Sequence, residues 1–215
     1  MNAYFNSFPN WSDKLAPRIQ NALQARRFDA YYCKTAADAK EQALKLLPEG
    51  SSVSWGGSVT IREIGLLDAV TAGNYEVIDR DTAKTPEERF ELMRQAFMCD
   101  TYLTSANAIT EDGEFVNVDG MGNRIAAITF GPKSVIVIVG MNKVCQTLQD
   151  AYVRARSYAS PLNTVRLDLQ TPCGSTGSCA DCKSSTSACS YIMTTRMSNL
   201  PGRIKVILVG EPLGL

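Results

Sequence analysis

Five consecutive β-branched residues, Val135-Ile-Val-Ile-Val139, constrain the fold more than any other stretch of the sequence. The run has no polar face, so it predicts a strand that is buried on both sides. Such strands belong to parallel sheets whose two faces are covered by helices. The rest of the chain must therefore supply further strands and helices for both faces.

Strand and helix patterns alternate through the first half of the chain. Apolar runs predict the strands, and a periodicity of three to four residues predicts the helices. In chain order we expect a helix at 11–27, a strand at 28–33, a helix at 35–47, a strand at 52–55, a helix at 60–72, a strand at 75–78 and a helix at 86–99. This order predicts an α/β fold with a mostly parallel sheet flanked by helices.

In the second half of the chain, strands and helices no longer alternate regularly. The residues predict a strand at 101–105, a hairpin turn at Asp112-Gly113, a short helix at 125–130, a helix that starts at Asn142, runs through Ala159 and is ended by Pro161, and a last strand at 204–210. No stretch has the composition of a linker. We expect a single domain over residues 1–215, with a cysteine-rich loop at 171–190.

Charge and hydropathy exclude several classes of protein. The chain has 22 basic and 22 acidic residues, so no excess charge indicates binding to nucleic acid or to an anionic membrane. The longest apolar run is far shorter than the roughly 20 residues of a membrane span. The first residues lack the basic and apolar segments of a signal peptide. We expect a cytoplasmic protein.

Four of the seven cysteines form one cluster: Cys173, Cys179, Cys182 and Cys189, with the spacing C-x5-C-x2-C-x6-C. The residues between them are mostly small or polar, so the loop has little to bury. Cysteines clustered in this way in a reducing compartment indicate metal binding more than disulfides. The chain has no histidine, which excludes histidine ligands and histidine-based catalysis.

The identity of the metal stays open at this level. Structural zinc sites with four cysteines usually contain two C-x2-C pairs, and only one pair is present. Uneven spacing is more typical of iron–sulfur clusters. An iron–sulfur cluster is the first hypothesis, zinc is the second, and the third is no metal, with redox-active, disulfide-bonded or free thiols.

A glycine turn, Gly56-Gly57-Ser58, lies between a predicted strand and a predicted helix. In an open α/β sheet, ligands bind at the carboxyl ends of the strands, and exposed backbone N–H groups there favour an anion. The turn therefore predicts a site for a small anionic metabolite, although glycines in a tight turn are often only geometric.

Polar residues downstream extend this candidate site: Asn107, Asp119, Asn123, Arg124 and Lys143. Arg124 has the planar fork that binds a carboxylate through two hydrogen bonds. Lys143 lies at the expected start of a helix, where a cation is unfavourable unless it meets an anion. Hairpin and turn geometry is the alternative explanation for the other polar residues.

Several segments in order resemble the LUD-domain (lactate-utilisation, LutC/YkgG-like) family, from about residue 12 to the C-terminus. The residues that carry the resemblance are Ser54-Trp-Gly-Gly-Ser-Val-Thr-Ile-Arg-Glu-Ile-Gly65, Thr104-Ser-Ala-Asn-Ala-Ile-Thr110, Gly113-Glu-Phe-Val-Asn-Val-Asp-Gly120, Gly122-Asn-Arg124, Gly131-Pro-Lys133 and Val139-Gly-Met-Asn-Lys143. A set of motifs in order is far more specific than any one of them.

The resemblance implies a fold like that of the NagB, RpiA and CoA-transferase group. It also implies a component of the oxidation of organic acids, of the lactate-to-pyruvate type, that works with iron–sulfur partner proteins. It identifies no catalytic residue here. The alternative functions are a domain that binds or transfers a phosphate, carboxylate or CoA ester, with the cysteine loop as a zinc or free-thiol accessory, and a non-catalytic scaffold.

Overall fold

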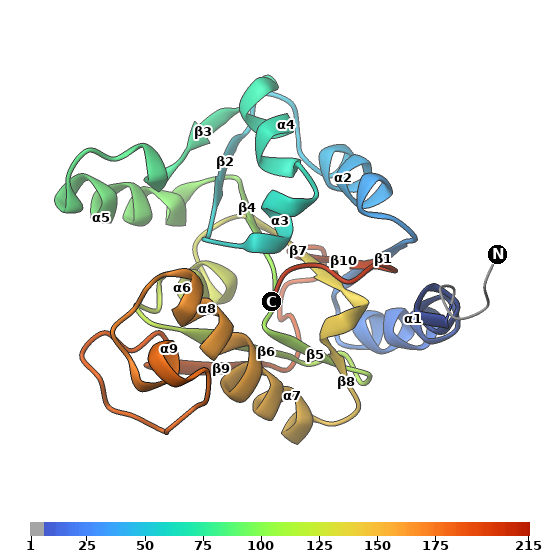
Figure 1. The fold of residues 1–215 in the computed structure, drawn as a ribbon. Coiled ribbons are helices and arrows are strands. Elements are labelled where there is room, and N and C mark those ends of the chain that lie inside the picture. The colour runs from blue at the N-terminus through green and yellow to red at the C-terminus, as the bar shows by residue number, and fades with distance from the viewer. Residues whose placement is uncertain (1–6) are drawn as a thin grey trace.

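The computed structural model describes residues 7–215 and contains a six-stranded sheet in which all neighbouring strands are parallel. The spatial order is β1 (Asp29–Cys33), β10 (Ile204–Val209), β7 (Ser134–Gly140), β4 (Thr101–Thr104), β2 (Ser52–Trp55) and β3 (Glu76–Ile78). Figure 1 shows helices on both sides of it. The prediction of an α/β fold with a mostly parallel sheet is confirmed.

The central strand β7 contributes side chains to both faces of the sheet. Ile136 and Ile138 belong to a core on one face, and Val135, Val137 and Val139 belong to the core on the other face. All five side chains are buried. The run of β-branched residues therefore forms the doubly covered strand that it predicts.

Each face of the main sheet is covered by different elements. One face packs against α2 (Ala36–Lys45), α3 (Val59–Glu63) and α4 (Leu66–Ala72). The other face packs against α1 (Ser7–Ala25), α6 (Asn123–Thr129) and residues of a second sheet. The helix α5 (Pro86–Gln95), capped by Thr85, follows β3 and lies beside the β2–β3 edge (Figure 1).

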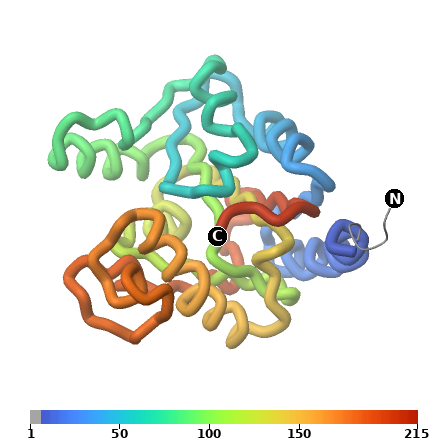
Figure 2. The backbone as a smooth tube through the Cα atoms, in the orientation of Figure 1, coloured from blue at the N-terminus to red at the C-terminus, as the bar shows by residue number. Residues whose placement is uncertain are grey.

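A second, smaller sheet lies below the main one in Figure 1. Its order is β8 (Val144–Cys145), β5 (Ala108–Thr110), β6 (Phe115–Asp119) and β9 (Tyr191–Thr195). The pair β5–β6 is the hairpin predicted at Asp112-Gly113, and its strands are antiparallel. Gly113 has φ +83, a left-handed conformation that favours glycine. In the tube trace of Figure 2, the orange loop 171–190 leads into β9.

Two predicted helices differ from the structure. The helix expected at 60–72 is divided into α3 and α4, because Gly65 adopts φ +68. The helix expected from Asn142 begins only at Leu148, where Thr147 and Asp150 form a capping box. Pro161 does not end it. The helix widens to a π turn at Ala155–Ala159 and continues as α8 (Ser160–Arg166).

The π turn explains why Pro161 is tolerated. Proline has no N–H to donate and its ring collides with the preceding turn of an α-helix. The wider turn moves the helix past this obstacle, and the Ser160 hydroxyl donates to the Ala155 carbonyl oxygen at 2.9 Å. Across residues 7–215, no helix is both long and apolar enough to cross a membrane.

Candidate functional site

The carboxyl ends of three neighbouring parallel strands place most of the predicted polar residues together. Gly56–Ser58 follow β2, Ser105–Asn107 follow β4, and Met141–Lys143 follow β7. Because the strands are parallel and adjacent, these segments meet at one edge of the sheet. Asp119 at the end of β6 and Asn123-Arg124 at the start of α6 approach the same edge.

Arg124 lies at the centre of this edge and is partly buried. Its Nη1 donates to Asn117 Oδ1 at 3.0 Å and to the Ser105 carbonyl oxygen at 3.3 Å. Its Nη2 donates to Asn107 Oδ1 at 2.9 Å and to the Val118 carbonyl oxygen. Both terminal nitrogens are therefore already used by the protein, which fits a structural cross-link. The predicted contact of Arg124 with a ligand stays a prediction.

Asp119 balances this arginine and starts α6. Its carboxylate accepts from the N–H groups of Met121, Gly122 and Arg124 at 3.1–3.2 Å, and lies 3.7 Å from Arg124 Nε. Burial lowers the pKa of Arg124, and the negative charge of Asp119 opposes that shift. The Asn123 side chain has no hydrogen bond within residues 7–215 and points into a neighbouring pocket.

Lys143 lies in a 3₁₀ turn before β8, not at the start of a helix as predicted. It is buried, and its ammonium group donates to Thr60 Oγ1 at 2.8 Å and Ser105 Oγ at 3.1 Å. Burial, together with the positive charges of Arg154 and Arg124, lowers the pKa of Lys143 to about 7, and the negative charge of Glu63 opposes that shift. A lysine with this pKa exchanges its proton near neutral pH.

The glycine turn lets two large side chains approach the backbone. A Cβ atom at Gly56 would lie 3.0 Å from the Tyr102 hydroxyl, and one at Gly57 would lie 2.9 Å from Arg80 Nη2. Neither glycine has a positive φ, so close approach rather than backbone conformation requires them. Ser58 caps α3 and accepts from the Ile61 N–H at 3.4 Å.

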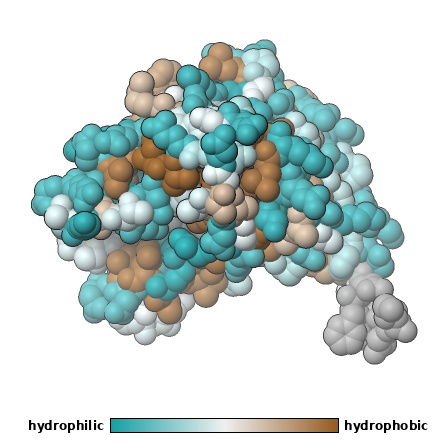
Figure 3. Space-filling model, turned by 90° about the horizontal axis from the view of Figure 1, so that it is seen from above, coloured by the Kyte–Doolittle hydropathy of each residue, from teal (hydrophilic) through white to brown (hydrophobic). Residues whose placement is uncertain are grey.

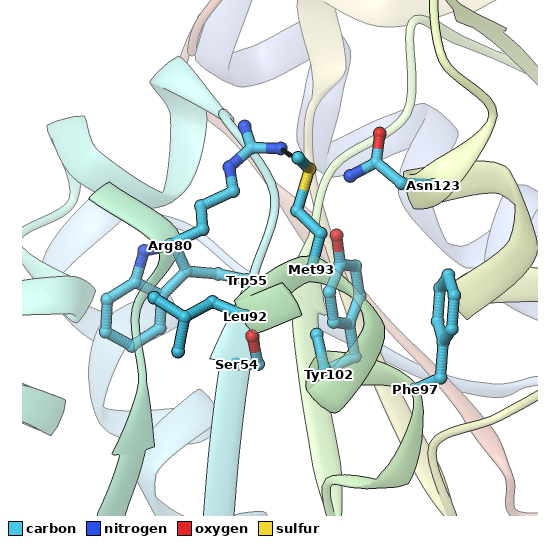
Figure 4. Close-up of a pocket in the computed structure, with 9 residues that line it drawn as sticks. Ser54, Trp55, Arg80, Leu92, Met93, Phe97, Tyr102 and Asn123 are labelled. Carbon is cyan, nitrogen blue, oxygen red and sulfur yellow. Dashed lines mark hydrogen bonds between the residues drawn. The ribbon is translucent and has the colours of Figure 1, made fainter. Parts of the chain in front are cut away.

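A small pocket, with no free space for a water molecule, lies beside this turn, between β2, β4, α5 and α6 (Figure 4). Its lining includes Trp55, Arg80, Met93, Tyr102 and Asn123. Of these residues, only Asn123 is among the predicted site residues. Arg80 follows β3 directly, so the rule that sites form at the carboxyl ends of parallel strands could have identified it.

The four clustered cysteines line one hollow on the surface of the molecule. Cys173, Cys179, Cys182 and Cys189 share it with Arg156, Thr164 and Thr171, among others. All four are partly buried and free of disulfides. The fold therefore places four cysteines, the first and last of which are sixteen positions apart in the sequence, in the lining of one hollow.

Local hydrogen bonds shape the hollow. Thr171 caps the single turn α9 (Pro172–Thr176), and its hydroxyl and that of Thr164 each lie 3.3 Å from the Cys173 sulfur. Burial alone would raise the pKa of Cys173, but these hydroxyls and nearby backbone N–H groups together lower it. A side chain at Gly174 would collide with the Leu169 carbonyl oxygen.

Two other cysteines also have polar neighbours at their sulfur atoms. Arg156 Nη2 lies 3.9 Å from the Cys179 sulfur and pairs with Asp181. The Ser187 hydroxyl lies 3.3 Å from the Cys189 sulfur. A guanidinium and hydroxyl donors around sulfur stabilise thiolates, which are the form that binds metal.

The cysteine hollow offers four sulfur atoms as donors. Between residues 7 and 215, no three Cys, Asp or Glu side chains converge on a point where one metal ion could be held. A zinc ion would need four sulfurs at about 2.3 Å, and so within about 4 Å of one another. An iron–sulfur cluster takes four cysteines on different iron atoms, and the four clustered cysteines line one hollow.

One helix joins the two regions. Thr164 of α8 contacts Cys173, and two residues later Arg166 Nη2 donates to the Gly57 carbonyl oxygen at 3.4 Å. The glycine turn and the cysteine hollow are therefore bridged by a short segment of α8. This bridge could not be predicted, because the sequence indicates a helix that ends before Pro161.

Comparison with known proteins places the chain in a family. No curated protein matches it at a significant level. A DUF162-family protein from Deinococcus radiodurans has a similar fold, with a TM-score of 0.55, 15% identity and coverage of 92% of this chain and 97% of that one. Ribose-5-phosphate isomerase A from Neisseria gonorrhoeae aligns at a TM-score of 0.34 and 14% identity, covering 54% of this chain and 56% of that one. The LUD-domain family matches residues 16–209, so the chain belongs to the LUD-domain family, as its sequence resemblance implies.

Proposed function

We propose that this lactate-utilisation-related chain is a component of organic-acid oxidation, of the lactate-to-pyruvate type, that binds an iron–sulfur cluster. Cys173, Cys179, Cys182 and Cys189 are the proposed ligands. The observation that carries the proposal is that all four line one hollow, although the loop between them has almost no core of its own.

The residues around the hollow have defined roles in this proposal. The hydroxyl groups of Thr164 and Thr171 each lie 3.3 Å from the Cys173 sulfur, that of Ser187 lies 3.3 Å from the Cys189 sulfur, and Arg156 offsets negative charge beside Cys179. Hydrogen bonds to sulfur and nearby charge raise the reduction potential of a cluster. A bound cluster would supply one-electron transfer. The surface position of the loop suits exchange of electrons with iron–sulfur partner proteins.

The direct test is anaerobic reconstitution of the full chain with ferrous iron and sulfide. We expect stoichiometric iron and acid-labile sulfide and a broad visible absorption band. Cys182→Ser should remove most of both. Cys145→Ser is the matched control, because Cys145 is also a partly buried free thiol but lies outside the hollow, and it should retain the cluster.

Three results would overturn the proposal. The first is a colourless protein without iron after reconstitution. The second is tight binding of zinc at one equivalent with no uptake of iron, which would make the loop a structural zinc site. The third is equal loss of iron in Cys145→Ser and Cys182→Ser, which would show that the iron is not held by the clustered cysteines.

A further inference from the structure

The pocket beside the glycine turn contains several hydrogen-bond donors without protein partners. Arg80 Nε and Trp55 Nε1 are buried and have no acceptor. The Tyr102 hydroxyl and the Asn123 amide, which line the same pocket, make no hydrogen bond within residues 7–215. Buried polar groups are normally satisfied, so a group of unsatisfied donors around one pocket indicates a missing acceptor.

Figure 4 shows how these groups are arranged. The Arg80 guanidinium, the Asn123 amide and the Tyr102 hydroxyl surround the sulfur of Met93. Arg80 Nη1 donates to that sulfur at 3.5 Å, and a thioether is a weak acceptor. Methionine has three rotatable bonds, so Met93 can turn aside and yield its place to a stronger acceptor.

Positive charge exceeds negative charge around Arg80. The nearest carboxylate, Asp81, lies 3.9 Å from Arg80 Nε and also pairs with Arg89 at 2.8 Å and Arg62 at 3.6 Å. Three guanidinium groups therefore share one carboxylate. Arg166, which reaches Gly57 from α8, adds a further cation nearby. An anion in the pocket would offset this excess.

Apart from Ser54, the remaining side chains of the pocket are apolar or aromatic. Leu92, Met93 and Phe97 form much of its lining. One guanidinium with free donors, a neutral amide and a hydroxyl match a single carboxylate, which accepts two parallel hydrogen bonds from an arginine. Apolar walls suit a short hydrocarbon body attached to that carboxylate.

We infer that this pocket binds a small monocarboxylate, with Arg80 as its main anchor and Tyr102 and Asn123 as further donors. Gly57 is a positioning residue, because a Cβ atom there would lie 2.9 Å from Arg80 Nη2 and would displace the flexible end of that side chain. The site itself does not depend on the cysteine cluster. The choice of lactate and pyruvate as probes rests on the proposed function.

The fluorescence of Trp55 can report binding at this site. The chain has two tryptophans, and Trp11 is exposed on α1. In Trp11→Phe, fluorescence comes from Trp55 in the pocket wall. Titration of this protein, without added metal, with sodium pyruvate, sodium lactate and sodium phosphate at constant ionic strength should give saturable changes with the carboxylates and none with phosphate.

Three variants in the Trp11→Phe background test the anchor. Arg80→Ala should weaken carboxylate binding about 10- to 100-fold, the range for loss of hydrogen bonds to a charged group. Gly57→Ala, which displaces the arginine without removing it, should weaken binding about 10-fold. Tyr102→Phe removes a hydroxyl that has no protein partner, so it should fold normally and bind a few-fold more weakly.

The matched control is Arg94→Ala, which removes the same charge from an exposed position of α5. Its affinity should be unchanged. Equal losses in Arg94→Ala and Arg80→Ala, or no saturable change with either carboxylate, would overturn the site. Saturable binding of phosphate alone would overturn the carboxylate assignment. Because none of these readouts involves iron, failure here is distinguishable from failure of the cluster proposal.

Discussion

The carboxyl edge of the sheet and the cysteine loop hold their shapes by different means. At the edge, Lys143 is buried and Arg124 is partly buried, and both are hydrogen-bonded to residues from several elements. In the loop 171–190, Thr171 is the only buried residue. The edge is thus fixed by the packed sheet that surrounds it, whereas the loop depends on local turns and hydrogen bonds.

This contrast separates two kinds of site. Groups at the sheet edge are positioned before any ligand arrives, which lowers the entropic cost of binding. A loop with little buried apolar area gains most of its order when its ligands are joined by a metal group, so binding and ordering are coupled.

The face seen from above in Figure 3 is mainly hydrophilic, with hydrophobic patches.

The largest effect is expected from Arg124→Met at the sheet edge. It leaves the acceptors of Asn107, Asn117 and Val118 buried without their donor, and Asp119 without its cation. We expect a loss of about 3–5 kcal/mol in the free energy of unfolding, measured by urea denaturation. A loss below about 1 kcal/mol would show that the edge does not rely on this cross-link.

A pH-dependent effect is expected from Lys143→Met. The folded pKa of Lys143 is about 7 against an ordinary 10.5, so between these values the unfolded chain binds more protons at this residue. This group therefore adds stability as pH rises from 7 towards 10, and its destabilising effect is complete below about pH 7. The contribution approaches, at most, about 1.4 kcal/mol per pH unit.

The measurement is the free energy of unfolding of both proteins between pH 7 and pH 9.5. Raised thiol pKa values, such as that of Cys99 at about 11, act in the opposite direction but are common to both proteins. The Lys143→Met curve should lack the rising slope that Lys143 causes, so the difference between wild type and variant should rise with pH. The exposed Lys14→Met should keep the wild-type slope. Parallel curves for Lys143→Met and wild type would contradict a depressed pKa.

The smallest effect is expected from Cys179→Ser in the metal-free protein. Its sulfur is partly buried in a loop that has little core, so the free energy of unfolding should fall by no more than about 0.5 kcal/mol. After reconstitution the same variant should be clearly less stable than wild type, because wild type alone gains stability from binding. An equal loss in both states would show that the thiol matters only for packing.

Much of the fold follows from residues near one another in the sequence. The β-branched run at 135–139 and the alternation before it predict the parallel sheet and its helices. The break between α3 and α4 at Gly65 and the π turn at 155–159 could not be predicted in this way. Both conformations depend on how α4 and α8 pack against the remainder of the protein. The helix begins at Leu148 because Thr147 and Asp150 cap it, a signal that the sequence does contain.

The candidate site also has features that the sequence predicts and features that it does not. The order of the strands determines where the loops after them meet, so the predicted polar residues do come to one edge of the sheet. These residues are Gly56, Gly57, Asn107, Asp119, Asn123, Arg124 and Lys143. That Arg124 is satisfied internally, while Arg80 has free donors, depends on side-chain packing between distant segments. The position of Arg80 just after β3 marks it as a candidate, but no local pattern shows that its donors stay free.

Hydrogen–deuterium exchange of the full chain, before and after anaerobic loading with iron and sulfide, tests the contrast between the two regions most directly. We predict that amides in 173–190 exchange rapidly in the metal-free protein and become protected on loading, while amides in 101–119 are protected in both states. A loop that is equally protected before and after loading, or protection gained equally at the sheet edge, would contradict this account.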